Sequence, residues 1–431
     1  MTLPPLRIAL AGLGTVGGGV ARLLAGQERL LALRAGRPLQ LVAVSARDRR
    51  KDRGFPLDSV AWFDDPVALA TAPGIDVVVE LIGGSEGPAR RLVEAALAAG
   101  RPVISANKAL IAHHGASLGR LAHEGGATLA YEAAVAGGIP IIKMLREGLV
   151  GNEVKRIYGI LNGTCNYILT TMRESGREFA EVLAEAQKLG YAEADPAFDV
   201  DGIDAAHKLA ILAALAFGCE VDLGHVHVEG IRHVGAQDIA YAEELGLRVK
   251  LIGLAQLIDG ALEQRVGPCL VPLEAPIATV EGVFNAVVAE GDFVGTVMAE
   301  GRGAGAGPTA SAVAADLVDL ARGRALPPFA LSAAQLRRLP ARSLEARRGA
   351  YYLRLMVVDR PGVIADVAAS LRDEDISMES MIQRGRAPGE VVSVVMTTHD
   401  TTEAAMRRAL ARIAALKAVV AEPRPIRIES L

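Results

Sequence analysis

The sequence GLGTVG occupies residues 12–17 and directly follows the apolar stretch LRIALA at residues 6–11. The apolar stretch is predicted to form a β-strand, and residues 16–24 have the spacing of an amphipathic helix. A GxGxxG loop between a first strand and a first helix is typical of dinucleotide-binding domains. The stretch therefore predicts a βαβ unit that holds the pyrophosphate of a dinucleotide.

Each residue of this loop has a physical task in that interpretation. Gly12 permits the tight turn, Gly14 lets the pyrophosphate approach the backbone, and Gly17 lets the helix pack on the strand. Thr15 and Val16 would present free N–H groups to the anion at the start of the helix. The alternative is a glycine turn with a structural role only.

The first 110 residues alternate between short β-rich runs and amphipathic helical stretches. Strands are expected at 6–11, 39–44, 77–81 and 102–105, and helices at 16–24, 65–70 and 87–99. This alternation predicts an α/β fold with a Rossmann-type doubly wound parallel sheet. We expect the nucleotide-binding domain to cover residues 1–137 and to be completed by about 303–323.

The pattern changes beyond this domain. Residues 138–302 are expected to form an α+β domain for substrate binding and dimerisation, with helices near 141–148, 166–174 and 178–189 and β-rich segments near 250–258 and 280–288. Residues 324–348 contain several prolines and arginines and read as a linker. Residues 349–431 repeat a strand, helix, strand, strand, helix, strand order, which predicts a ferredoxin-like domain.

Composition excludes several classes of protein. At 431 residues the chain is long enough for two or three domains, and its net charge of −4 comes without a basic, aromatic-rich block for nucleic acid. The longest uncharged apolar run, residues 209–219, is shorter than the roughly 20 residues that span a membrane. The three cysteines lack the spacing of a disulfide framework or a zinc site, and no export signal is evident, so we expect a cytoplasmic protein.

The end of the second expected strand bears on the choice of cofactor. An acidic residue there would bind the 2′-hydroxyl of NAD, but the sequence reads Ser45-Ala46-Arg47. Arg47, with more basic residues behind it, could face the 2′-phosphate of NADP instead. NADP(H) is therefore favoured and NAD(H) stays possible, because a solvated basic loop would look the same.

A second informative stretch, GYAEADPAFDVDGIDAAHK, covers residues 190–208 and contains five carboxylates. Such crowding is costly unless cations, substrate or solvent relieve it. Asp204 and Lys208 are spaced i, i+4 on one face of the helix that follows, so they can interact. The chain has only eight lysines. The pair could be an oriented acid/base or an ordinary surface ion pair, and spacing alone leaves both open.

Two shorter stretches complete the set. SANK at residues 105–108 ends an expected strand, which would place Lys108 at the carboxyl edge of the sheet, where ligands bind in such folds. YEAAVAGGIP at residues 131–140 is a glycine-rich turn whose backbone carbonyls could face a hard cation. Its plainer interpretation is a loop that joins two domains.

Together these stretches resemble homoserine dehydrogenases. The matching motifs are GLGTVG at 12–17, SANKA at 105–109, YEAAVAGGIPII at 131–142, GILNGTCNYIL at 159–169 and GYAEADPAFDVDGIDAAHKLAIL at 190–212. The resemblance covers roughly the first 320 residues. It implies NAD(P)H-dependent interconversion of L-aspartate 4-semialdehyde and L-homoserine, a reaction of threonine, methionine and isoleucine biosynthesis.

The resemblance also assigns roles to residues of the reaction site. Lys208 resembles the acid/base that exchanges a proton with the substrate oxygen, and Lys108 the family's second active-site lysine beside the nicotinamide. Asp204 would orient Lys208 and bind substrate. Glu193 would hold the substrate ammonium, and Asp199 is a further expected substrate-binding residue.

The same resemblance implies two binding sets. The expected cofactor contacts are Gly12, Gly14, Thr15, Val16, Gly17, Arg47, Ser105, Lys108, Gly190 and Gly305, the last in a late glycine loop at 303–309 that leads into a helix of the cofactor domain. A structural monovalent cation, Na⁺, is expected on the carbonyls of Glu132, Val135, Gly137 and Ile139.

The C-terminal module resembles an ACT domain. DRPGV at residues 359–363 is the usual strand-to-helix opening of such domains, where Pro361 starts a helix and Gly362 leaves room for a ligand near the backbone. The resemblance implies a homo-oligomer, dimer or tetramer, with threonine as feedback inhibitor at the seam between paired domains. The alternative is a domain that assists assembly only.

Two other functions stay open on the sequence alone. A different small-substrate dehydrogenase could share the Rossmann half, although it would not be expected to carry Glu193, Asp204 and Lys208 in this register. A nucleotide-binding redox sensor with an amino-acid-binding tail would bind the cofactor without turnover.

Overall fold

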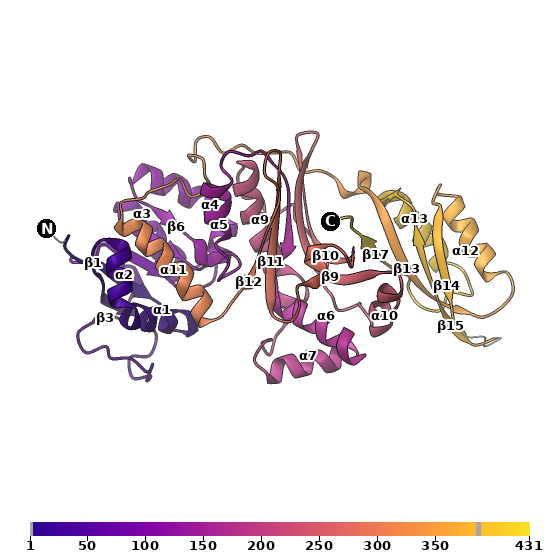
Figure 1. Ribbon diagram of the computed structural model, residues 1–431, viewed down its shortest axis with the longest axis horizontal. Helices are drawn as coiled ribbons and strands as arrows, with labels where there is room; N and C mark the ends of the chain where they lie inside the picture. The colour runs from indigo at the N-terminus through magenta and orange to yellow at the C-terminus, as the bar shows by residue number, and fades with distance from the viewer. Residues whose placement is uncertain (1–2, 385–388) are drawn as a thin grey trace.

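The computed structural model describes residues 3–384 and 389–431. The chain runs through three regions in sequence order, from the indigo nucleotide end, through the magenta and red middle, to the yellow C-terminal end (Figure 1). None of the helices in the described ranges combines the length and the apolar character needed to cross a bilayer.

The first sheet is parallel throughout and has the strand order β3-β2-β1-β4-β5-β6. Its strands are β1 Leu6–Ala11, β2 Leu39–Ser45, β3 Ala61–Phe63, β4 Val77–Glu80, β5 Val103–Ser105 and β6 Leu129–Ala130. The order reverses between β1 and β4, which creates the crevice where a doubly wound sheet binds its ligand. The expected Rossmann-type fold class is confirmed.

Helices cover both faces of this sheet. They are α1 Thr15–Gly26, α2 Glu28–Ala35, α3 Pro88–Ala98, α4 Lys108–Glu124 and, much later in the chain, α11 Ala306–Ala321. Helix α11 packs against α1 (Figure 1). The contact is so close that a Cβ on Gly19 would come within 2.6 Å of the Ala306 carbonyl oxygen. The expected helix at 65–70 is a single 3-10 turn, Pro66–Ala70, capped by Asp65.

The second sheet carries most of the remaining chain and has the order β12-β11-β7-β9-β10-β17-β13-β15-β14. Its first part is built from β7 Val154–Ile160, β9 Leu247–Ile258, β10 Ala261–Pro272, β11 Phe284–Gly291 and β12 Gly295–Arg302. Helix α9, Ile203–Phe217, lies against β7, β9 and β10 and is buried along nearly its whole length. Helices α6 Gly163–Ser175, α7 Phe179–Lys188 and α10 Ala236–Glu244 complete this region.

The C-terminal region continues the same sheet. It consists of β13 Arg348–Val358, α12 Val363–Arg372, β14 Met378–Gln383, β15 Val391–Thr398, α13 Glu403–Ala414 and β17 Arg424–Ile428. The strand order β17-β13-β15-β14 is that of a ferredoxin-like fold and confirms the expected ACT architecture. Strand β17 also pairs in parallel with β10, at Cys269↔Arg427 and Leu270↔Ile428. The two domains are therefore joined by backbone hydrogen bonds as well as by the chain segment between them.

Candidate active site

A cavity of about 540 Å³ opens between the first sheet and α9. Among the residues that sequence analysis selected, Val16, Lys108, Gly190, Glu193, Asp199, Asp204, Lys208 and Gly305 all line it. Motifs up to about 290 residues apart in the chain thus meet at one place. Gly12, Gly14, Thr15, Gly17, Arg47, Ser105 and the four residues of the expected cation loop are not part of its lining.

The three glycines of the loop at 12–17 differ in whether the surrounding protein leaves room for a side chain. Gly12 has φ +101°, and a Cβ there would lie 2.5 Å from the Leu81 carbonyl oxygen, so packing demands glycine. A Cβ on Gly17 would lie 2.0 Å from the Gly12 oxygen. Gly14, the N-cap of α1, has φ −76° and open space around its Cβ position. Nothing in the protein requires glycine at Gly14, which fits a loop that leaves room for a pyrophosphate at a helix N-terminus.

The centre of the cavity is a carboxylate between two ammonium groups. Lys208 Nζ donates to Asp204 Oδ2 at 2.7 Å and to the Leu161 carbonyl oxygen at 2.7 Å. Lys108 Nζ lies 3.1 Å from the other oxygen, Asp204 Oδ1. Burial alone would raise the pKa of Asp204, but the charges of Lys208 and Lys108 and the hydrogen bonds from Lys208 and Asn162 hold it well below its usual range. Asp204 is therefore ionised and orients both lysines.

Asn162 connects Asp204 to a second acid. Its Nδ2 donates to Asp204 Oδ2 and to Asp199 Oδ1, both at 2.8 Å, while its Oδ1 accepts the Cys165 N–H and caps α6. Burial and the nearby Asp204 charge raise the pKa of Asp199. No cation within residues 3–384 or 389–431 forms an ion pair with Asp199. This carboxylate is therefore available to a positively charged group on a ligand.

Glu193 lies on the exposed side of the same cavity. Its carboxylate forms no ion pair with any residue that the structure describes. Gln187 Nε2 donates to the Glu193 carbonyl oxygen at 3.0 Å and fixes the loop. Glu193 and Asp199 thus place two carboxylates in the lining of a cavity that also carries two lysines, an arrangement suited to a zwitterionic amino-acid substrate.

The loop that presents Lys108 is held by a buried acid that sequence analysis did not select. Glu80, at the end of β4, accepts the Ile82 N–H at 2.7 Å, and its other oxygen accepts the Ser105 hydroxyl at 2.7 Å. Burial raises the pKa of Glu80. Asn107 then caps α4, in which Lys108 is the first residue. Ser105, expected to contact the cofactor, directs its side chain to Glu80 rather than into the cavity.

Arg47 is exposed in the loop after β2. The neighbouring guanidinium groups of Arg49 and Arg53 lie 5.9 and 5.5 Å from the centre of the Trp62 ring, and Arg53 also bonds to the carbonyls of Lys51 and Asp48. The basic loop is thus ordered by aromatic and backbone contacts, and Arg47 remains at its exposed end.

The expected cation loop has the sharp bend that carbonyl ligation needs. Ala136 and Gly137 both have positive φ, 53° and 42°. In the described parts of the chain the Val135 and Gly137 carbonyls accept no hydrogen bond, whereas the Ile139 carbonyl accepts the Ile141 N–H at 2.8 Å. The Glu132 side chain binds the N–H groups that begin the next helix. Its burial and the nearby Asp316 raise the pKa of Glu132 to about 7. The free carbonyls fit a hard monovalent cation.

Asn162 and Thr164, which line the cavity, and Phe198, which contacts Lys108, were not selected from the sequence. Asn162 and Thr164 lie within the quoted GILNGTCNYIL motif, and the N-cap position of Asn162 was the available signal. Lys108 Nζ lies 5.5 Å from the centre of the Phe198 ring. The His207 ring packs edge-on against the same phenyl ring, with 5.4 Å between the ring centres. Only the fold brings Phe198 to Lys108, so no local pattern could have revealed that contact.

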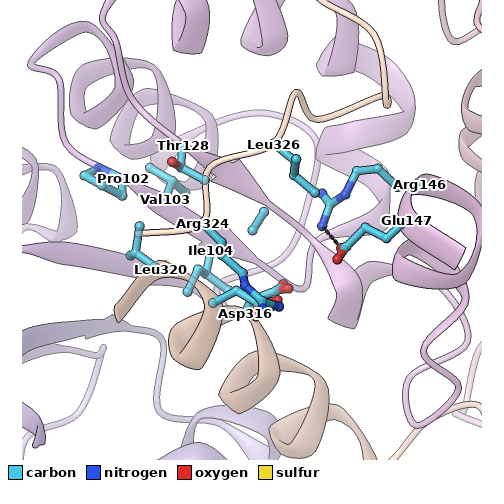
Figure 2. A pocket seen from close by; sticks show the side chains of 12 residues that line it. Pro102, Val103, Ile104, Thr128, Arg146, Glu147, Asp316, Leu320, Arg324 and Leu326 are labelled. Atoms are coloured by element: carbon cyan, nitrogen blue, oxygen red, sulfur yellow. Dashed lines mark hydrogen bonds and ion pairs between the residues drawn. The ribbon is translucent and has the colours of Figure 1, made fainter. Parts of the chain in front are cut away.

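A different pocket, under the edge of the first sheet, is shown in Figure 2. It is lined by Val103, Ile104 and Asp316 together with Arg146 and Glu147, which form an ion pair at 3.1 Å. Its volume of about 20 Å³ has room for about one water molecule. It is therefore too small for a substrate or a cofactor, and the larger cavity is the candidate site.

A doubly wound sheet with a GxGxxG loop, opening onto a cavity with an oriented lysine pair, defines the class of nicotinamide-dependent oxidoreductases. Family models match all three regions of the chain. The homoserine dehydrogenase NAD binding domain matches residues 12–132, homoserine dehydrogenase matches 140–318, and the ACT domain matches 351–417.

Individual relatives agree with the family models. A homoserine dehydrogenase from Neisseria gonorrhoeae is 43% identical over the full length of both chains. The crystal structure of a homoserine dehydrogenase from Thiobacillus denitrificans is 44% identical, with a TM-score of 0.94 and complete coverage of both chains. A hyperthermophilic archaeal homoserine dehydrogenase in complex with NADPH is 28% identical with a TM-score of 0.61, covering 73% of this chain and 97% of that one. The chain belongs to the homoserine dehydrogenase family and carries a C-terminal ACT domain.

Proposed function

We propose that this protein interconverts L-aspartate 4-semialdehyde and L-homoserine with a nicotinamide cofactor. The observation that carries the proposal is the position of Asp204. It is buried between Lys208 and Lys108 in the cavity that the glycine-loop residue Val16 also lines. The cleft therefore joins a dinucleotide loop, an oriented proton carrier and two free carboxylates.

Lys208 is the residue that exchanges a proton with the substrate oxygen. Asp204 and the Leu161 carbonyl take two of the three hydrogen-bonding directions of its ammonium, which leaves the third for the substrate. Lys108 stabilises negative charge that develops on the same oxygen during reduction. The bound cofactor supplies or accepts the hydride.

The substrate's ammonium group is held by Glu193 and Asp199. Neither forms an ion pair with a described residue, and both line the cavity. Asn162 fixes Asp199 by its 2.8 Å hydrogen bond and keeps the acid at a set distance from Asp204. The carbon skeleton is thereby oriented with its aldehyde toward the lysines.

For the cofactor we propose NADP(H), with NAD(H) possible. The glycine loop would bind the pyrophosphate, and Gly190, Gly305 and Lys108 would surround the nicotinamide end, while Ser105 would act behind them through its bond to Glu80. Arg47 would bind the 2′-phosphate from its exposed position. The archaeal relative bound to NADPH supports a nicotinamide cofactor. The test compares kcat/KM for NADPH and for NADH in wild type and in Arg47→Ala. We expect kcat/KM to fall for NADPH only. An equal fall for both cofactors would contradict the proposed role of Arg47.

The cation loop is proposed to hold Na⁺ as a structural ion. The carbonyls of Glu132, Val135, Gly137 and Ile139 would be the ligands, and the ion would stabilise the bend between the nucleotide domain and the second sheet. Its contribution there is structural rather than chemical.

For regulation we propose that the ACT domain lowers activity when it binds threonine and that it pairs with a second copy in a dimer or tetramer. The domain's presence supports this. Threonine titration of the full-length enzyme tests the effector. We expect the rate of NADPH oxidation to fall as the threonine concentration rises. A rate that does not change with threonine would mean that the domain serves assembly only.

The primary experiment adds L-aspartate 4-semialdehyde to purified protein and NADPH. We expect NADPH absorbance to fall only when the semialdehyde is present, and binding of NADPH without turnover would instead favour a redox sensor. In Lys208→Ala the rate should fall about 10²–10⁴-fold while NADPH affinity stays near that of wild type. Turnover like that of wild type in this variant would end the proposed role of Lys208.

A further inference from the structure

The most unusual side chain in the cleft is an amide without partners. Asn285 is the second residue of β11 and lines the cavity, yet only 1% of it is exposed. Neither its Oδ1 nor its Nδ2 has a hydrogen-bond partner within the described part of the chain. Buried polar atoms are almost always paired in folded proteins, so an amide with both ends free calls for a ligand.

Two glycines make room for this amide. A Cβ on Gly303 would lie 2.3–2.4 Å from the Asn285 amide atoms, and one on Gly163 would lie 3.3 Å from Oδ1. Gly303 belongs to the late glycine loop at 303–309. In this loop Gly305 has φ +112° and caps α11. Asn285 is therefore enclosed between the GILNGTCNYIL motif at 159–169, which contains Gly163, and the late glycine loop that leads into the nucleotide domain.

The chemistry of the free atoms restricts the ligand. An amide offers an acceptor and a donor side by side, so the group that satisfies both must itself offer a donor and an acceptor. A carboxylate would leave Oδ1 unpaired, and an ammonium would leave Nδ2 unpaired. A primary carboxamide satisfies both.

We propose that Asn285 binds the carboxamide of the nicotinamide ring and so fixes which part of the ring faces the substrate. This inference rests on the proposed dehydrogenase function. The substrate's ammonium is assigned to Glu193 and Asp199 and its reacting oxygen to the two lysines, and its α-carboxylate has no hydrogen to donate to Oδ1. The nicotinamide carboxamide offers an N–H donor and a carbonyl acceptor side by side, and Asn285 is the unpaired amide that matches it.

The test is equilibrium binding to three ligands, without turnover. The ligands are NADPH, its reduced 3-acetylpyridine analogue, in which a methyl replaces the amide nitrogen, and 2′-phospho-ADP-ribose, which lacks the nicotinamide. In Asn285→Ala we expect the Kd for NADPH to rise about tenfold, in line with the loss of paired hydrogen bonds. The rise should be clearly smaller for the analogue and absent for 2′-phospho-ADP-ribose.

A second variant separates binding from folding. Asn285→Leu has nearly the same size, and because the amide has no protein partner to lose, the Tm of the ligand-free protein should be unchanged or higher. A matched control is Asn152→Ala, which removes an amide that bonds to Leu149 and Val294 outside the cavity. That variant should bind all three ligands like wild type.

Equal losses for NADPH and its analogue would overturn the inference, as would a loss for 2′-phospho-ADP-ribose. A raised KM for aspartate semialdehyde with unchanged cofactor binding would overturn it too, since Asn285 would then serve the substrate. Failure of the wild type to bind any of the three ligands would contradict the proposed function itself.

Discussion

At the scale of single residues, the reaction site depends on how one buried carboxylate is surrounded. The i, i+4 spacing of Asp204 and Lys208 is visible in the sequence, and the 2.7 Å contact agrees with it. The contact of Asp204 with Lys108 is not visible, because the two residues lie almost a hundred positions apart and meet only when α4 packs on α9. The spacing predicts the Asp204–Lys208 pair, whereas the burial of Asp204 and its contact with Lys108 depend on the fold.

His207, the neighbour of Lys208 in α9, provides a prediction about pH. Burial and the nearby charge of His113 lower its pKa to about 4, while Asp204 opposes and the lysines Lys108 and Lys208 reinforce that shift. Its ring packs edge-on against His113 at 5.3 Å. Between pH 6.5 and about 4 the unfolded chain therefore binds more protons at this position than the folded one.

The free energy of unfolding should consequently fall as the pH drops from 6.5 toward 4, by at most about 1.4 kcal/mol per pH unit from this residue. In His207→Gln the fall should be shallower, as measured by urea unfolding at pH 7, 6 and 5. A slope unchanged in His207→Gln would contradict the account of this site.

At the scale of elements, the glycine loop between β1 and α1 gives a paired prediction. Gly12→Ala should lower the free energy of unfolding by at least about 2 kcal/mol, because φ is +101° and the new Cβ meets Leu81. Gly14→Ala should cost no more than about 1 kcal/mol. Yet it should weaken NADPH binding about tenfold or more by filling the space at the start of α1.

Thermal unfolding and fluorescence titration with NADPH measure the two effects separately. If Gly14→Ala bound NADPH like wild type, the loop would be a structural turn, which is the alternative that the sequence left open.

Elements with a clear pattern were predictable to within a residue. Strand β1, Leu6–Ala11, begins and ends where the sequence indicated, and β2, Leu39–Ser45, differs from its expected range by one residue. Strand β10 was missed because it has no alternation: Leu262 to Val271 are all buried, and the run includes Glu263, Gln264 and Arg265. Charged residues in a buried strand hide it from hydrophobic periodicity.

At the scale of the whole molecule, those buried charges explain how the two domains are joined. Arg265 of β10 pairs with Glu429 at 2.8 Å, and Arg347 at the start of the ACT domain bonds to Glu429 and lies 3.8 Å from Glu263. Arg427 of β17 reaches back to Glu229 at 3.2 Å. The network lies beside the β10–β17 pairing, so the ACT domain is fixed to the sheet that supports α9.

Removing one member of this network should leave charges buried without partners. We expect Glu429→Ala to lower the free energy of unfolding by about 3–5 kcal/mol. Glu422→Ala removes the acid of an exposed pair with Arg424 and should cost less than about 1 kcal/mol. Urea unfolding of the two variants provides the comparison. Equal, small losses would show that the domains are held together in another way.

The joined sheet was not predictable from local sequence, since residues 324–348 read as a separating linker. Deleting residues 349–431 would expose the edge of β10 and leave Arg265 without its partner Glu429. Loss of activity in such a truncation would therefore not identify a regulatory role. Effector studies therefore belong on the full-length protein. The motifs contain the residues that the fold brings together in one cavity, whereas the domains are joined by strand pairings between residues distant in the chain.

The most direct measurement is a single-turnover experiment on the full-length protein. Enzyme saturated with NADPH is mixed with L-aspartate 4-semialdehyde, and the loss of NADPH absorbance is followed in wild type, Lys208→Ala and Lys143→Ala. Lys143 pairs with Asp316 and Asp319 away from the cavity and serves as the matched lysine. We predict a hydride-transfer phase about 10²–10⁴-fold slower in Lys208→Ala alone. A phase as fast as that of wild type in Lys208→Ala would contradict the account.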